Sequence, residues 1–218
     1  MQHFEQQLAG MKERLLLMAS YAETAVARAV EALRTRNDGL AAQVKDEDTV
    51  LDRLEIELDE LAIQLLAQAP LATDLRFITV AMKITQNLER VGDEATKIAK
   101  RTRELNAEPP LAAAARLPEL AAKATVLLHA ALNAFVSGDT AAARALIAED
   151  KAIDALNKEI LAELEAVMTS QPEAIKRCLN LMVVSRSLER VADHAKNVAE
   201  EVVYLREALD IRHAQARA

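Results

Sequence analysis

Leu88-Glu89-Arg90-Val91 recurs without change as Leu188-Glu189-Arg190-Val191, 100 residues later. The match continues past the tetrapeptide, because Asp93 and Asp193 each stand two residues after it. Self-similarity at a fixed spacing indicates an internal duplication. These two stretches therefore decide the fold, and the rest of the chain can be aligned from them.

Working outward, the duplication extends upstream at a slightly longer offset. Three pairs are separated by 102 residues: Pro70 and Pro172, Asp48 and Asp150, Asp52 and Asp154. The two-residue change falls between the prolines and the repeated tetrapeptides. Pro109-Pro110 then breaks the chain near its midpoint. We expect two tandem units, residues 1–107 and residues 108–218.

The composition indicates that each unit is helical. Only 4 of 218 residues are glycine, 5 are proline, and 2% are aromatic. All-β folds need many Gly/Pro-rich turns and favour aromatic and β-branched residues, so they are excluded. The few glycines stand too far apart to build the phosphate loop of a doubly wound α/β fold.

Five breaks in the sequence separate six expected helices. They cover residues 8–36, 40–67, 73–105, 112–136, 140–168 and 173–208. In the break before the third helix, Thr73 or Asp74 is a candidate N-cap. The fold class that we expect is all-α, with two tandem three-helix bundles related by duplication.

Acidic residues occupy matched places in the two units. The first acidic patch is defined as Asp48, Asp52, Glu89 and Asp93, and the second acidic patch as Asp150, Asp154, Glu189 and Asp193. On a helical wheel, the acids of the repeated tetrapeptide segments lie roughly 140° to 180° from the apolar stripe of their helix. The others lie roughly 100° to 140° from theirs. We therefore expect all eight carboxylates on the outer surface.

Two readings of these patches remain open. Like charges four residues apart cost about 0.2–0.5 kcal/mol each, and a cost repeated in matched places favours a bound cation. Oxygen-only ligands suit hard cations such as magnesium, manganese or oxidised iron, whereas zinc prefers His or Cys. The alternative is a solvated face whose carboxylates pair with neighbouring cations: Arg90, Lys97, Arg190 and Lys196.

Several other classes are disfavoured. A net charge of −7 without a basic stripe argues against nucleic-acid binding. The longest apolar run near the start, residues 15–19, is too short to insert into a membrane. A single cysteine makes no internal disulfide, and a cytoplasmic location is the default.

No catalytic constellation is recognisable either. There is no nucleophile with an adjacent base and no Glu-x-x-His pair of the ferritin-like di-iron type. His194 follows the second motif aspartate, and we expect it to be a solvated surface side chain, with a peripheral metal ligand or a proton-sensitive neighbour of the second patch as the alternative. We therefore expect no enzymatic activity.

Taken together, Asp74-Leu75-Arg76 and the two extended motifs resemble the PhoU family of phosphate-transport regulators. The resemblance covers essentially the whole chain. It implies two three-helix bundles with metal clusters on their surfaces, held by the eight carboxylates of the two acidic patches. It also implies a homodimer that restrains a sensor histidine kinase when phosphate is ample, by bridging that kinase and the ATPase subunit of the phosphate ABC transporter.

The two halves depart from the family pattern in different ways. The family often has asparagine one turn after the motif aspartate, which Asn197 matches and Lys97 does not. A cation at Lys97 substitutes for part of the metal charge, so the first patch is expected to bind metal differently. Asp74 and Arg76 become Ala174 and Lys176 in the second half, so the halves are not expected to be functionally equal.

Two alternatives to a regulator are retained. The matched carboxylates are also consistent with a metal-dependent helical-bundle enzyme or a metal store. A plain dimerising scaffold would bind no metal and would have no phosphate phenotype.

Overall fold

The computed structural model describes residues 2–212, and that part of the chain contains six α-helices and no β-strand. The helices are α1 (Gln2–Thr35), α2 (Asp38–Leu66), α3 (Ala72–Asn106), α4 (Leu117–Ser137), α5 (Thr140–Ser170) and α6 (Ile175–Glu207). Two short 3₁₀ turns, η1 (Ala112–Ala114) and η2 (Pro172–Ala174), precede α4 and α6. The prediction of an all-α fold with three helices in each half is confirmed.

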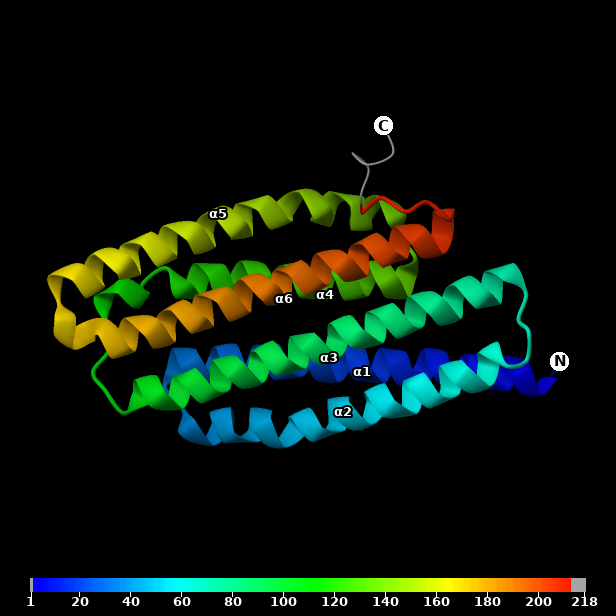
Figure 1. Cartoon of the computed structure of the whole chain (residues 1–218), viewed down its shortest axis with the longest axis horizontal. Coiled ribbons are helices and arrows are strands. Elements are labelled where there is room, and N and C mark those ends of the chain that lie inside the picture. Colours follow the sequence, from blue (N-terminus) through cyan, green and yellow to red (C-terminus); the bar gives the residue numbers. More distant parts are fainter. Residues whose placement is uncertain (1, 213–218) are drawn as a thin grey trace.

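The six helices run along the length of an elongated body (Figure 1). α1, α2 and α3 contact one another in the first half, as do α4, α5 and α6 in the second. The two bundles meet mainly where α3 packs along α6, with a smaller contact between α1 and α4. In Figure 1 α3 and α6 cross the middle of the molecule, with α2 on one side and α5 on the other.

The observed helix ends follow local chemistry. Asn37 Oδ1 accepts a hydrogen bond of 3.0 Å from the Leu40 amide at the start of α2, and Asp139 caps α5 in the same way at 2.9 Å. The expectation that Thr73 or Asp74 caps α3 is wrong, because that helix already begins at Ala72 and has no side-chain cap. α4 begins at Leu117 rather than residue 112, since Pro118 is tolerated only in the first turn of a helix.

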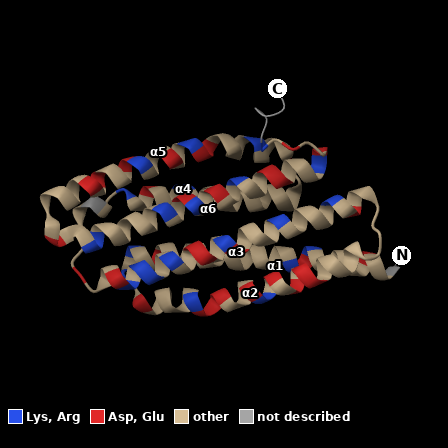
Figure 2. Cartoon of the chain, viewed as in Figure 1, with Lys and Arg blue, Asp and Glu red and all other residues tan. Residues whose placement is uncertain are grey.

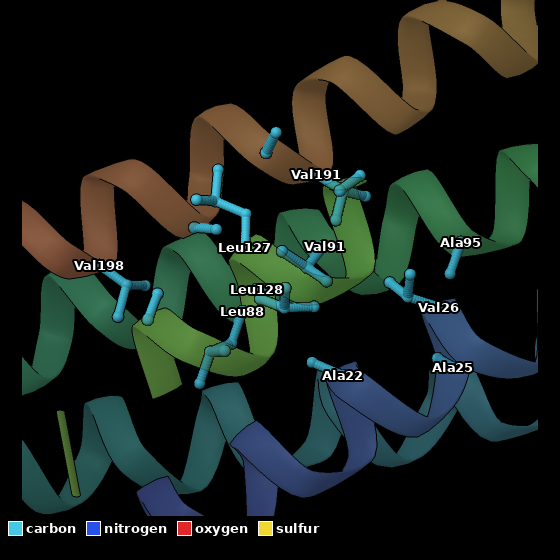
Figure 3. Packing of buried hydrophobic residues seen from close by; sticks show 14 of the residues in the cluster. Ala22, Ala25, Val26, Leu88, Val91, Ala95, Leu127, Leu128, Val191 and Val198 are labelled. Atoms are coloured by element: carbon cyan, nitrogen blue, oxygen red, sulfur yellow. The ribbon is translucent and has the colours of Figure 1, made fainter. Parts of the chain in front are cut away.

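Small aliphatic side chains fill a core that both halves share. Ala22 and Ala25 of α1, Val91 of α3, Leu128 of α4 and Val191 of α6 lie within one cluster (Figure 3). Alanines at such positions allow helix axes to approach closely, because they leave little volume to accommodate. The scarcity of aromatic residues therefore accords with a core of small aliphatic side chains between closely packed helices.

α4 is long and apolar enough, by length and composition alone, to cross a membrane. Its apolar residues nevertheless have an interior role, since Leu120, Leu127 and Leu128 are buried in the shared core. A core helix buried on several sides passes the same compositional test.

Candidate metal centres

Each acidic patch is built by a pair of neighbouring helices. α2 packs on α3 in the first half, and α5 packs on α6 in the second, so the acids of each pair of helices meet. Elsewhere on the face shown in Figure 2, acidic and basic residues are interspersed along the helices.

The second patch brings three carboxylates into close contact. Asp150, Asp154 and Asp193 each offer one carboxylate oxygen, and these oxygens lie within 4.8 Å of one another. Glu189 is outside this trio but close enough to interact with it. Burial raises the pKa of Glu189 first, and the nearby charges of Asp193 and Asp154 raise it further.

Asp150 corrects the expectation that all eight carboxylates face outward. Its side chain is only 4% exposed, because Lys196 of α6 lies over it with Nζ 2.6 Å from Asp150 Oδ2. On a helical wheel Asp150 lies at the edge of the polar face of α5. In the structure α6 packs against that edge. In the same patch Asp154 and Asp193 are half-buried.

The other oxygen of Asp150 provides a test of whether a metal ion fits. Asp150 Oδ1 is buried and has no hydrogen-bond partner among residues 2–212. A buried carboxylate oxygen without a partner is costly, and a hard cation beside three carboxylates would satisfy it. The donor set of the second patch therefore fits magnesium, manganese or iron, with Asp150, Asp154 and Asp193 as ligands and Glu189 at the border.

The first patch is more open. Asp52 and Asp93 are exposed, and Asp48 and Glu89 are half-buried. The pKa of Asp48 is raised by burial and then by the charges of Asp52 and Asp93, which places these acids close together. Among residues 2–212, however, the only trio of carboxylates within 4.8 Å of one another lies in the second patch.

Glu55 lies beside the first patch, and the sequence pattern did not single it out. Burial raises its pKa, as do the charges of Asp59 and Asp52. The pair Glu55 and Asp59 is visible in the sequence as acids four residues apart. Selecting only pairs with a counterpart in both halves discards it, because the residue that matches Glu55 is the neutral Asn157.

Gly92 allows α2 and α3 to approach at the first patch. A Cβ added to Gly92 would lie 2.4 Å from Leu51 Cδ1 and 3.2 Å from Asp48 Oδ1. The glycine that follows Val91 in the first motif is therefore needed for close helix packing and not for backbone flexibility. Its counterpart in the second half is the buried Ala192.

One groove between α3 and α6 is lined by Glu89 and Asp93 of the first patch and by Asp193 of the second. The groove has a volume of about 800 Å³ and is bordered by Asp93 on one side and Asp193 on the other. Lys97 lies in it, with Nζ 3.6 Å from Asp93 Oδ2 and 3.0 Å from Glu94 Oε1. The sequence located both patches but did not show that they share a groove.

His194 lines this groove and joins the two halves. Its Nδ1 lies 3.0 Å from Asn87 Oδ1, so the expectation of a solvated surface histidine is wrong. The reason is again that α6 packs on α3. Burial lowers the pKa of His194, and the positive charge of Arg90 lowers it further, so the ring is neutral at pH 7.

The sequence and the fold of this chain are similar to those of known proteins. The model of the PhoU domain matches this chain twice, over residues 15–102 and 117–202. The chain belongs to the PhoU family. The family's domain thus occurs once in each half of the duplication, and each copy contains one acidic patch.

Relatives of the family match the chain over most of its length. A phosphate-specific transport system accessory protein PhoU homolog from Pseudomonas aeruginosa is 37% identical, over 97% of this chain and 88% of that protein. A protein of the same name from Aquifex aeolicus is 35% identical, over 95% of this chain and 94% of that protein.

Solved structures have the same architecture. The crystal structure of PhoU from Pseudomonas aeruginosa is 36% identical, with a TM-score of 0.91 over 94% of this chain and 100% of that chain. That of the phosphate transport system regulatory protein PhoU from Streptococcus pneumoniae, 24% identical over 95% of this chain and 99% of that chain, has the same fold with a TM-score of 0.87.

Proposed function

We propose that this chain is a negative regulator of phosphate uptake and of phosphate-starvation signalling. In this proposal it acts in the cytoplasm as a homodimer. It binds a sensor histidine kinase and the ATPase subunit of the phosphate ABC transporter, and it neither binds nucleic acid nor inserts into membranes. The observation that carries the proposal is the match of the family's domain to both halves, together with relatives named as phosphate-transport accessory proteins.

A non-enzymatic role accords with the architecture. The two bundles share one core and present long helical faces, which suits a protein that contacts two partners at once. The names of the relatives describe accessory proteins and no catalysed reaction.

The proposal includes metal binding at both acidic patches. All eight carboxylates act as ligands or border residues, and the metal is a hard cation: iron, manganese or magnesium. A bound cation supplies positive charge that offsets the repulsion between the carboxylates, and this orders each patch as a surface. The compact trio and the unpartnered oxygen of Asp150 support this part of the proposal.

A deletion strain tests the regulatory role. We expect phosphate-starvation genes to be expressed in phosphate-rich medium when the gene is deleted, and to be repressed again when it is restored. We also expect the purified chain to retain the kinase and the transporter ATPase in a binding assay. Normal repression in the deletion strain would refute the proposal.

Elemental analysis tests the metal. We expect Asp93→Ala combined with Asp193→Ala to lower the bound metal at least several-fold in protein purified without chelators or an affinity tag. Glu60→Ala with Glu173→Ala is the matched control, because it removes two exposed carboxylates outside the patches. Unchanged metal content in the Asp93 and Asp193 variant would eliminate metal binding from the proposal.

The second candidate function is a metal-dependent helical-bundle enzyme or a metal store. It rests on the compact trio of the second patch, which is the arrangement that a catalytic or storage site also requires. A screen for turnover with the metal-loaded protein separates it from the regulator: metal-dependent turnover in a strain with normal phosphate regulation would favour this candidate.

A further inference from the structure

The two patches differ in one basic residue. In the second half Lys196 of α6 reaches Asp150, with Nζ 2.6 Å from Oδ2. The residue that aligns with Lys196 in the first half is Thr96, and the acid that aligns with Asp150 is Asp48. Thr96 is neutral, so the first patch has no ammonium group at the matching place.

Lys196 acts on two members of the trio, Asp150 and Asp193. Its side chain is 30% exposed and that of Asp150 is 4% exposed, so the ammonium lies between the buried carboxylate and the solvent. Its charge also acts on Asp193, whose pKa it lowers against the opposing effects of burial and Asp150. The trio, whose carboxylate oxygens lie within 4.8 Å of one another, thus has a cation of the protein itself bound to Asp150.

This cation does not complete the coordination of Asp150. Within the described part of the chain, Oδ1 is buried without a hydrogen-bond partner, whereas Oδ2 accepts a hydrogen bond from the ammonium. A metal ion that bound the trio would come close to the ammonium, and the repulsion between the two cations would act against its binding.

We propose that Lys196 is a built-in counter-ion that competes with metal for the second patch, and that metal binding displaces it from Asp150. The inference rests on the metal binding proposed above and adds a residue that sets its strength. Lys196 stabilises the metal-free protein and weakens metal binding by the same interaction.

Lys97 does not duplicate this arrangement. It lies one residue later than the position of Lys196, and its Nζ is closer to Glu94 than to the patch residue Asp93. Its side chain is 45% exposed, and no ion pair connects it to Asp48. An ion pair between an ammonium group and the buried aspartate of the patch is therefore a feature of the second half.

The duplication supplies the variants for a test. Lys196→Thr introduces the residue of the first half, and Thr96→Lys places a lysine in the first half. Asp48→Asn with Asp52→Asn removes two acids of the first patch and leaves the second patch to be measured alone. Lys158→Thr is the matched control, because it removes an exposed lysine of α5 that has no ion pair among residues 2–212.

Mn²⁺ is titrated calorimetrically into metal-free protein carrying the two asparagine substitutions. We expect Lys196→Thr to tighten Mn²⁺ binding by about tenfold or more, which corresponds to about 1.4 kcal/mol. Lys158→Thr should change the affinity less than twofold. In the converse background, where Asp150→Asn and Asp154→Asn weaken the second patch, Thr96→Lys should weaken Mn²⁺ binding to the first patch.

The displacement of Lys196 has its own readout. Without metal, its amine should react slowly with an acylating reagent, and Mn²⁺ should raise its reactivity several-fold, measured by mass spectrometry of the modified peptide. Asp150→Asn should raise the reactivity in the absence of metal.

The outcomes separate this inference from the metal proposal. If Mn²⁺ binds the parent and Lys196→Thr with equal affinity, or binds Lys196→Thr more weakly, Lys196 is not a competitor although the patch is a metal site. If Mn²⁺ binds neither protein, metal binding at the second patch is refuted, and the inference is refuted with it.

Discussion

At the scale of single residues, the ionised carboxylate of Asp193 lowers the stability of the metal-free protein. Its pKa is raised by burial and by the charge of Asp150, because its carboxylate is held in a partly buried place beside like charges. The folded chain therefore binds a proton at Asp193 more tightly than the unfolded chain does. The resulting penalty is present above the raised pKa and disappears as the pH falls below it.

Asp193→Asn should remove this penalty. In the presence of a chelator we expect the melting temperature to rise by about 1–2 °C at about pH 7, and not to rise at about pH 2.5, which lies below the ordinary aspartate pKa of about 3.9, so that the carboxyl is protonated in both states. Thermal unfolding followed by circular dichroism measures both values. Glu60→Gln controls for the loss of one exposed acid, and an equal gain in that variant would contradict the explanation.

Gly92 is the second informative residue. Gly92→Ala adds a Cβ that meets Leu51 Cδ1 at 2.4 Å, so we expect a loss of about 1–3 kcal/mol by overpacking, even though alanine favours helix. Urea unfolding measures the loss. A second substitution, Leu51→Ile, should recover part of this lost stability. The double variant would then have alanine and isoleucine at this contact, as the second half has at Ala192 and Ile153. A stable Gly92→Ala protein would show that α2 and α3 have room at the first patch.

At the scale of elements, Arg36 connects the end of α1 to the end of α3. Its Nη2 donates to the carbonyl oxygens of Leu105 at 3.0 Å, Asn106 at 3.1 Å and Glu108 at 2.6 Å. The last carbonyls of a helix have no partner within the helix, and a positive charge there is also favoured by the helix dipole. Arg36 thus closes the C-terminal end of the helix that contains the first motif.

Arg36→Ala should lower the free energy of unfolding by about 1 kcal/mol, because three carbonyl groups lose a charged donor at a partly exposed position. Arg34→Ala is the control. Arg34 is exposed and, among residues 2–212, forms its ion pair with Glu31 one turn away, so its loss should cost at most about 0.5 kcal/mol. Chemical denaturation compares the two, and equal losses would argue against a capping role for Arg36.

At the scale of the whole molecule, the two bundles are joined by packing as well as by the chain. α3 lies along α6, and side chains of α1, α3, α4 and α6 form one apolar cluster (Figure 3). The division at residues 107 and 108 stays a prediction about units of sequence. Because the core crosses that division, each half alone would expose the apolar face that α3 and α6 bury against each other.

A protease site inserted between residues 107 and 112 tests this. After complete cleavage we expect the two halves to elute together in size-exclusion chromatography and to unfold in one transition. The physical reason is that the buried contact between α3 and α6 does not depend on the linker. Uncleaved protein with the same insertion is the control, and separation of the halves in native buffer would show two independent bundles.

The duplication, the six helices and the matched acids that face each other across α2 and α3 and across α5 and α6 could be read from the amino-acid sequence. These properties depend on local chemistry: apolar residues three and four apart define a buried stripe, and few breaks interrupt it. The match between Asp48 and Asp150, or between Glu89 and Glu189, required no knowledge of tertiary structure.

Only the tertiary structure decided which polar residues would meet. Asp150 lies buried beside Lys196, His194 lies against Asn87, and Asp93 and Asp193 border the same groove. The helical wheel gives the direction of a side chain about its own helix, but not what the neighbouring helix places over it. That depends on how α3 packs on α6 and α5 on α6, between residues far apart in the chain, where the free energy of burying apolar surface sets the arrangement.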